Sequence, residues 1–299
     1  MTDEVKQQLC AWAQTYHCTD FIDTDPVQFP HRYREQRDIE ISGLLTAVLS
    51  FGNRSMILKK ADELDALMGH SPLRYVLSRR WDDDFKSNDR RSFYRMVSYA
   101  AFRCYFEKLY AVYAAGKTLE DALLGYSGIP MQQLCAFLGV SDRNPQKKLN
   151  MFLRWMIRRD SEVDFGVWKR MNPSDLLIPL DTHVCRVAYH IGLTDKSSFS
   201  LTNARRITEA LAQVFPGDPC LGDFALFGYG VTHKYPLKFH RSIETVMTVS
   251  GNGADGEFVF LCKRTGKDVR TSGSDSSSGS NVPPVVFLPV DSAPSYVSG

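Results

Sequence analysis

The spacing of apolar residues constrains this chain more than any other feature, because it follows the period of an α-helix. Between residues 41 and 49 the apolar side chains lie three or four positions apart, which places them on one helical face. These residues are Ile41, Leu44, Leu45, Val48 and Leu49. Up to about residue 249 we find no internal repeat and no convincing run of alternating strands. The sequence therefore predicts an all-α protein.

Further helices are expected where a helical pattern is bounded by Gly, Pro or Asn. Residues 92–115 are rich in Tyr, Phe and Ala and contain no Gly or Pro, so we predict one long helix there. The other predicted helices cover residues 57–68, 119–124, 131–137, 146–159, 182–191, 202–214 and 222–227. Short strands remain open as an alternative within this part of the chain.

The character of the sequence changes after about residue 249. Residues 272–281 are rich in Ser and Gly, and a polar end that contains Pro283 and Pro284 follows. Such a segment cannot bury enough apolar surface to offset chain entropy, so we predict that residues 272–299 are disordered. Residues 250–271 are left open between a small β-like extension and unstructured chain.

Charge and cysteine usage exclude several classes of protein. The net charge of +2 is too small for a protein that coats nucleic acid, although it permits a local basic face. Seven cysteines without a C-x-x-C pair indicate reduced thiols. The charged start and the lack of a long apolar run predict no signal peptide, no membrane span and a cytoplasmic location. Missing G-x-x-x-x-G-K-S/T and G-x-S-x-G motifs argue against P-loop NTPases and α/β-hydrolases.

Residues 178–188, which read I-P-L-D-T-H-V-C-R-V-A, are the most informative segment. Asp181 precedes an amphipathic helix and is a good N-cap, because its carboxylate accepts hydrogen bonds from free N–H groups of the first turn. The buried stripe of that helix is predicted to be Val184, Val187, Ala188 and Ile191. On these grounds alone, capping is as reasonable a role for Asp181 as catalysis.

The predicted helix at residues 146–159 combines an apolar stripe with a basic ridge. The apolar positions are Leu149, Phe152, Leu153 and Met156, and the predicted exposed ridge is Lys147, Arg154 and Arg158. A ridge of this kind is usually a solvated face. A Lys at the N-terminal end of a helix is also partly desolvated beside the positive end of the dipole, and both effects favour a nucleophilic amine.

Three segments resemble motifs of the endonuclease III family of helix-hairpin-helix DNA glycosylases. Residues 178–188 resemble its V-D-T-H-V-x-R-V segment, and residues 147–153 (K-K-L-N-M-F-L) resemble its K-T-A-N-x-x-L helix. Residues 44–50 (L-L-T-A-V-L-S) resemble its L-(I/L)-x-x-x-L-S helix, which precedes a loop that inserts a side chain into the DNA stack. The resemblance covers residues 38–230 unevenly, and the whole chain resembles an uncharacterised bacterial family within this superfamily.

The resemblance implies a two-lobed helical fold, with one lobe at about residues 38–150 and the other formed by residues 1–37 and 178–249. It implies that Lys147, or Lys148 beside it, is the nucleophile and that Asp181 is the catalytic carboxylate. The implied partner is duplex DNA with a damaged base, bound by a monomer. The residues expected to contact DNA are Asn53, Arg54, Arg154, Arg158 and His183.

The chain departs from the family's pattern at the hairpin and at the cofactor. Where the family has a Gly-rich L-P-G-(I/V)-G, residues 138–145 read L-G-V-S-D-R-N-P, so the helix-hairpin-helix is degenerate. Residues 160–177 form an insert, as in the archaeal 8-oxoguanine glycosylase branch. The family's four-Cys pattern is missing, so we predict no iron–sulfur cluster and no other cofactor. His183 and His190 are seven residues apart, which does not suit a helical metal pair, so we predict no metal site.

Three classes of function fit these observations. The first is a base-excision enzyme that flips a damaged base out of duplex DNA and cleaves its glycosidic bond. The second is a non-catalytic nucleic-acid-binding protein that kept the fold, which the degenerate hairpin favours. The third is a helical scaffold, which only the near-neutral charge supports. We favour the enzyme because of the Lys–Asp pair, while noting that a fold does not by itself establish a function.

Overall fold

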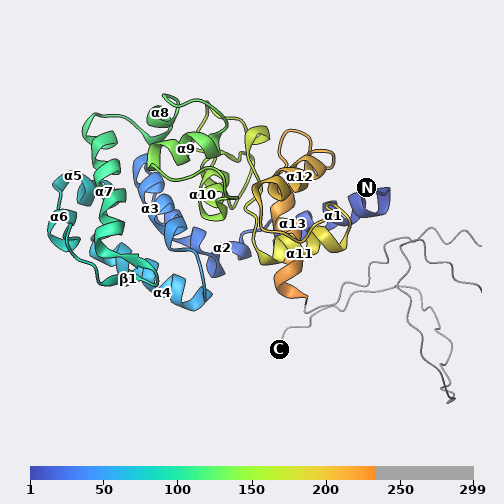
Figure 1. Ribbon diagram of the computed structural model, residues 1–299, viewed down its shortest axis with the longest axis horizontal. Coiled ribbons are helices and arrows are strands. Elements are labelled where there is room, and N and C mark those ends of the chain that lie inside the picture. The colour runs from blue at the N-terminus through green and yellow to red at the C-terminus, as the bar shows by residue number, and fades with distance from the viewer. Residues whose placement is uncertain (234–299) are drawn as a thin grey trace, which may run out of the picture. The chain divides into compact units, whose positions relative to one another are not determined.

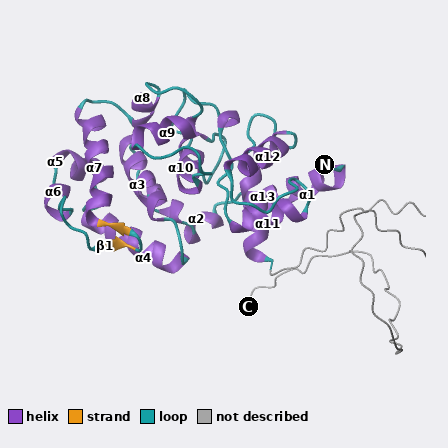
Figure 2. Ribbon diagram, in the orientation of Figure 1, coloured by secondary structure: helices purple, strands orange, loops and turns teal. Residues whose placement is uncertain are grey.

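The computed structural model describes residues 1–233, which are mostly helical (Figures 1 and 2). The prediction of a mostly helical chain is confirmed, whereas the predictions for residues 250–271 and 272–299 lie outside the described residues. The elements up to residue 84 are α1 (Asp3–Tyr16), α2 (Asp20–Thr24), the 3-10 turns η1 (Pro26–Gln28) and η2 (Pro30–Arg32), α3 (Gln36–Leu49), α4 (Arg54–Leu67), α5 (Pro72–Ser78) and α6 (Trp81–Asp84).

A short hairpin and further helices complete the described chain. They are β1 (Ser92–Tyr94), β2 (Val97–Ser98), α7 (Tyr99–Ala114), α8 (Leu119–Leu123), α9 (Pro130–Leu138), α10 (Lys147–Ile157), the 3-10 turn η3 (Pro173–Asp175), α11 (Thr182–His190), α12 (Leu201–Ala212) and α13 (Leu221–Thr232). Among the described helices, none combines the length and the apolar character needed to cross a bilayer. Helix α13 continues beyond the predicted end at residue 227.

The helix predicted from residue 92 is wrong at its start, because residues 92–98 form an antiparallel hairpin instead. Ser92 pairs with Ser98 and Tyr94 pairs with Val97. Arg95 lies between them with a φ of 52°, a left-handed conformation that a continuing helix excludes. The Ser98 side chain then accepts a hydrogen bond from the Ala101 N–H and caps α7. Turns are usually recognised in a sequence by Gly or Pro, and residues 92–115 contain neither, so the turn at Arg95 has no such signal.

One hydrophobic cluster surrounds α3, which is buried on every side from Ile39 to Leu49. The five residues predicted to form one face of this helix are all buried, as is the predicted stripe of α10. Helices α3 and α10 pack together, and Gly43 permits their close approach. A Cβ atom at Gly43 would lie 3.2 Å from the Met156 side chain and 3.3 Å from the Phe152 ring.

A second hydrophobic cluster joins the two ends of the described chain. Helix α1 contributes Leu9 and Trp12, and α11, α12 and α13 contribute most of the rest. The predicted buried stripe of α11 is confirmed. Trp12 of α1 stacks on Tyr229 of α13, with ring centroids 4.0 Å apart. Helix α13 therefore packs between α1 and α11, and Figure 1 shows these three helices side by side.

Gly228 sets the distance between α1 and α13, so the Gly228→Ala protein should be less stable. The added Cβ would lie 2.2 Å from Cγ of Tyr16 and 2.5 Å from its Cβ, atoms too close to the backbone to move freely. Overpacking of this kind costs about 1–3 kcal/mol, which outweighs the roughly 1 kcal/mol that Ala gains over Gly in a helix. Urea denaturation should show a lower midpoint. Gly125→Ala is the control, because its Cβ would meet only a carbonyl oxygen at 3.4 Å; equal midpoints for both variants would contradict this packing.

Candidate functional site

A pocket of about 400 Å³ opens where the start of α10, the start of α11 and α13 face the chain around α2 and α4. Its apolar lining is Phe21, Pro26, Ile57, Met151, Pro179, Phe227 and Val231. Its polar lining is Asp25, Ser50, Arg54, Lys147, Arg154, Asp181, His183 and Asp223, with the backbone of Gly52. The predicted catalytic residues Lys147 and Asp181 thus line the same pocket.

Lys147 and Lys148 differ in their surroundings although they are neighbours in sequence. Lys147 is the first residue of α10 and lines the pocket, where it is half-buried. The amine of Lys148 instead donates to the Val48 carbonyl at 3.0 Å and lies 4.5 Å from the centroid of the Phe51 ring. Burial, and then the charge of Lys147, lowers the pKa of Lys148. Of the two amines, the structure presents that of Lys147 to the pocket.

Asp181 caps α11, as its position in the sequence predicts. Its Oδ1 atom accepts a hydrogen bond of 2.9 Å from the Val184 N–H. Within the described residues no hydrogen bond engages Oδ2, and the side chain lines the pocket. The cap fixes the carboxylate without using both oxygens, so capping and a chemical role for Asp181 are compatible.

Two further carboxylates line the pocket, and the sequence analysis missed both. Asp25 is 7% exposed, and burial raises its pKa against the opposing effects of the Val27 N–H and of Arg154. Asp223 is 4% exposed on α13 and pairs with Arg154. Burial raises the pKa of Asp223 to about 6, Arg154 opposes the rise, and the charge of Asp181 adds to it. The pocket therefore brings three carboxylates close to Lys147.

The residues described up to 233 hold no group of three or more His, Cys, Asp or Glu side chains arranged for a metal ion.

The sequence of the chain matches one protein family. Residues 25–138 and 130–232 match the family described as a protein of unknown function, DUF2400, and these ranges cover more than half of the 299 residues. The chain belongs to the DUF2400 family. No curated protein and no solved structure matches it. The DUF2400 match includes all six charged residues of the pocket named above, from Asp25 to Asp223.

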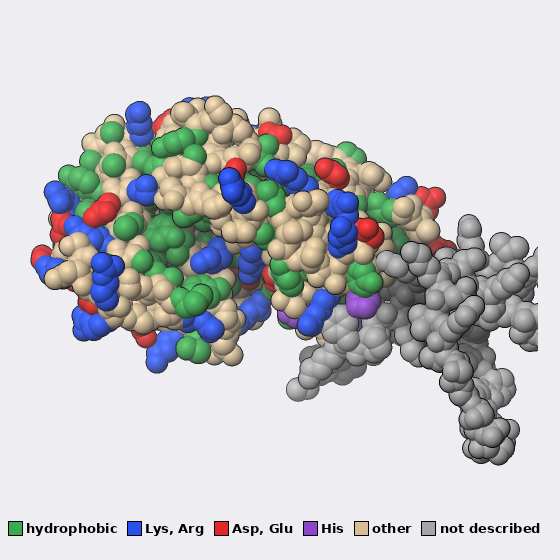
Figure 3. Space-filling model, viewed as in Figure 1, with side chains coloured by type: hydrophobic (Ala, Val, Ile, Leu, Met, Phe, Trp, Pro, Cys, Tyr) green, Lys and Arg blue, Asp and Glu red, His purple; other side chains and the backbone are tan. Residues whose placement is uncertain are grey.

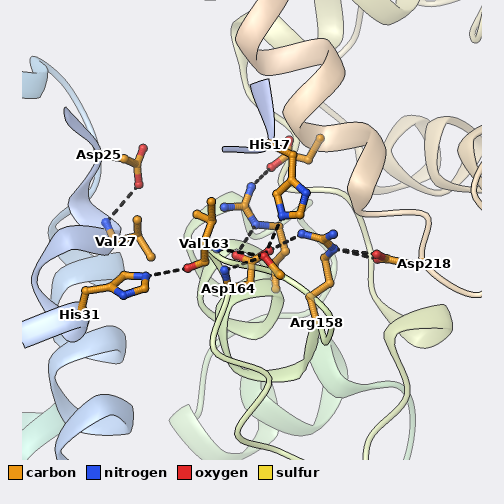
Figure 4. A network of polar contacts seen from close by, with 11 residues as sticks. His17, Asp25, Val27, His31, Arg158, Val163, Asp164 and Asp218 are labelled. Carbon is orange, nitrogen blue, oxygen red and sulfur yellow. Dashed lines mark hydrogen bonds and ion pairs between the residues drawn. The ribbon is translucent and has the colours of Figure 1, made fainter. Parts of the chain in front are cut away.

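The prediction that Arg154 and Arg158 belong to an exposed ridge of this DUF2400 chain is wrong, because the two residues are only 4% and 1% exposed. Arg154 Nε donates to Asp164 at 3.2 Å, and its Nη1 donates to Asp223. Arg158 donates to Asp164 at 2.5 Å and to Asp218 at 2.8 Å, and Figure 4 shows it between these two carboxylates. Both guanidinium groups are thus neutralised inside the protein, where they cannot hold phosphates from solution.

The segment at residues 160–177 supplies counter-charge that makes this burial possible. Its Asp164 bonds to both arginines, and its Ser161 hydroxyl bonds to His17 Nε2 at 2.7 Å. At Val163, the carbonyl contacts His31 Nε2 at 2.8 Å, a contact that Figure 4 also shows. Burial, and then the charge of Arg158, lowers the pKa of His17. In this DUF2400 chain, the segment at residues 160–177 therefore ties α10 to the N-terminal segment.

The remaining predicted DNA contacts lie at or near the pocket. Asn53 is outside its lining and caps α4, because its Oδ1 accepts from the N–H groups of Ser55 and Met56. Arg54 lines the pocket with 40% of its side chain exposed. His183 also lines it, with Nδ1 at 2.7 Å from the Gly230 carbonyl. Figure 3 shows Lys and Arg side chains spread over the face of the DUF2400 protein that is viewed in Figure 1.

Proposed function

We propose that the protein is a DNA base-excision enzyme, a glycosylase with lyase activity. The observation that carries this proposal is the shared pocket of Lys147 and Asp181, a primary amine and a carboxylate at the N-termini of two separate helices. The three motif resemblances and the mostly helical fold support it. The pocket volume of about 400 Å³ falls within the usual range for small-ligand sites and has room for a flipped base.

In the proposed reaction the amine of Lys147 attacks C1′ of the target nucleotide. The bond from C1′ to the base breaks, and its electron pair leaves with the base, which gains a proton. Asp181 accepts a proton from the Lys147 ammonium and stabilises the positive charge that develops on the sugar. Ring opening then leaves an imine between Lys147 and C1′. Loss of a proton from C2′ of this imine to a base then forms a C2′–C3′ double bond and expels the 3′ phosphate, which cleaves the strand.

A second candidate is a nucleic-acid-binding protein without chemistry. The connection between α9 and α10 favours it. In the resembled family this connection is rich in Gly and its backbone binds a phosphate, whereas here the loop contains only Gly139. The residue before Lys147, Gln146, takes a left-handed φ of 43° and bonds to the Ser141 carbonyl instead. This candidate predicts DNA binding without any covalent intermediate.

Borohydride trapping separates the two candidates. An imine between Lys147 and an opened sugar is reduced by borohydride to a stable amine, which migrates with the protein on a denaturing gel. We expect a covalent product with a duplex that carries one abasic site, at a rate well above that of a bystander protein of similar Lys content. Binding of the same duplex without any trapped product would instead establish the non-catalytic candidate.

Arg95 is the exposed cation beside the pocket that we expect to contact a phosphate. It belongs to the hairpin turn, and its guanidinium lies beside Gly52 and 5.6 Å from the centroid of the Phe51 ring. In Arg95→Ala the slope of log affinity against log salt should therefore fall by about one unit. Lys117→Ala is the control, because Lys117 is exposed and lies beyond the C-terminal end of α7. An unchanged slope in Arg95→Ala would remove this residue from the DNA interface.

A further inference from the structure

Asp25 is a buried carboxylate with hydrogen-bonding capacity left open to the pocket. Its Oδ1 accepts the Val27 N–H at 3.1 Å. Its Oδ2 lies 3.7 Å from Nη2 of Arg54, which is an ion-pair distance beyond hydrogen-bond reach. Within the described residues, no hydrogen bond to Oδ2 is formed, although the residue is only 7% exposed.

Two buried carboxylates outside the pocket, Asp65 and Asp164, have both oxygens engaged by the protein. Asp65 accepts from Arg32, Tyr33 and His70, and both oxygens of Asp164 bind arginines. Oδ2 of Asp25 is not enclosed by the protein and has no donor among the described residues, so it can accept a hydrogen bond from a ligand that enters the pocket. Asp25 differs from Asp65 and Asp164 in just this respect.

We propose that Asp25 and Arg54 read the edge of the target base, an inference that rests on the proposed function. Together they offer one acceptor beside one donor, which complements a lactam edge, an N–H next to a carbonyl. The N–H would donate to Oδ2 of Asp25, and Arg54 would donate to the carbonyl oxygen. Because a lactam N–H is more acidic than the amine of adenine or cytosine, it makes the stronger charge-assisted bond to a carboxylate.

Two aromatic rings of the pocket contact each other edge to face, and we expect the base to stack on one of them. Phe21 and Phe227 both line the pocket, with ring centroids 6.1 Å apart, and the guanidinium of Arg54 lies 5.8 Å from the Phe227 centroid. Base–aromatic stacking accepts any base, so the choice among bases falls to the polar pair. Lys147 and Asp181 act on the sugar, and Asp25 with Arg54 selects the base attached to it.

The test compares Asp25→Asn with the parent on two kinds of DNA. An abasic duplex has no base to read, so borohydride trapping on it should stay within about twofold of the parent. Removal of a lactam base should fall roughly 10- to 100-fold, the loss of one hydrogen bond to a charged group. The matched substrates are hypoxanthine against adenine and uracil against cytosine. In the parent we expect removal of the lactam member of each pair, and removal of the amine members instead, or of none of the four, would overturn the inference.

Asp23→Asn is the matched control, because it makes the same chemical change at an exposed carboxylate two residues away and outside the pocket. It should match the parent in both assays. Equal losses by Asp25→Asn in trapping and in base removal would mean a structural role, and no loss in either would mean no role; each result overturns the inference. A parent that is never trapped on abasic DNA would instead refute the proposed function, so the two failures are distinguishable.

Discussion

The Lys147→Arg protein is expected to form no trapped product with abasic DNA. Arginine keeps the positive charge and much of the length of the side chain at the start of α10. Its guanidinium stays protonated at any working pH and cannot form the imine, so reduction has nothing to trap. The measurement is the yield of covalent protein–DNA product after borohydride treatment, with duplex binding measured on the same samples. Binding should persist, since the charge at this position is retained.

Lys148→Arg is the matched control for this change. The neighbouring amine donates to the Val48 carbonyl, which an Arg also can do, and it lies outside the pocket lining. Its trapping should therefore stay close to that of the parent. Trapping that survives in Lys147→Arg and disappears in Lys148→Arg would mean that the nucleophile is Lys148. Trapping that survives in both variants would refute a nucleophile at this helix start.

In Asp181→Asn we expect base removal to slow by roughly 10²- to 10⁴-fold, the usual contribution of a general base. Asparagine is as good an N-cap as aspartate, so its side-chain oxygen should still accept the Val184 N–H. What is lost is the negative charge that takes the proton from Lys147 and stabilises the charged sugar. Single-turnover rates on base-containing duplex measure this loss, and a rate within about twofold of the parent would leave Asp181 as a helix cap alone.

A stability control excludes partial unfolding as the cause of a slow Asp181→Asn protein. Ser200 caps α12 by accepting the Asn203 N–H and lies outside the pocket lining. Ser200→Ala should therefore cost about 1 kcal/mol of stability without slowing base removal. If both variants lose activity in proportion to the decrease in their unfolding midpoints, the lost activity reflects the lost caps and not the lost charge.

The helical periods of this sequence predict local structure well, because they record which side of a helix is buried. The stripes of α10 and α11 and the buried face of α3 follow directly from them. Asp181 is predictable as a cap for the same reason, since capping depends on residues within one turn. The shared pocket of Lys147 and Asp181 has no local signal, and only the motif resemblance pointed to it.

The errors at the basic ridge and at the pocket carboxylates arise from partners that neither lie within one helical turn nor share the helix. Periodicity places Arg154 and Arg158 together on α10, but it cannot show that Asp164, Asp218 and Asp223 neutralise them. A signal for Asp223 was present nonetheless, because it is a single acidic residue near the start of an otherwise apolar helix. Asp25 carries a weaker signal, an Asp before Pro26 that caps a turn, and nothing in the sequence places it beside Lys147.

The packing of α1 against α13 has a consequence for how the chain folds during its synthesis. Helix α1 is synthesised before its partners in the second hydrophobic cluster, which begin only at Ile178. The cluster around α3 draws mainly on intervening residues and can form earlier, since its contacts close shorter loops. Until α13 emerges, Leu9 and Trp12 lack the surface that covers them. The nascent chain thus carries an exposed amphipathic helix until α13 is made.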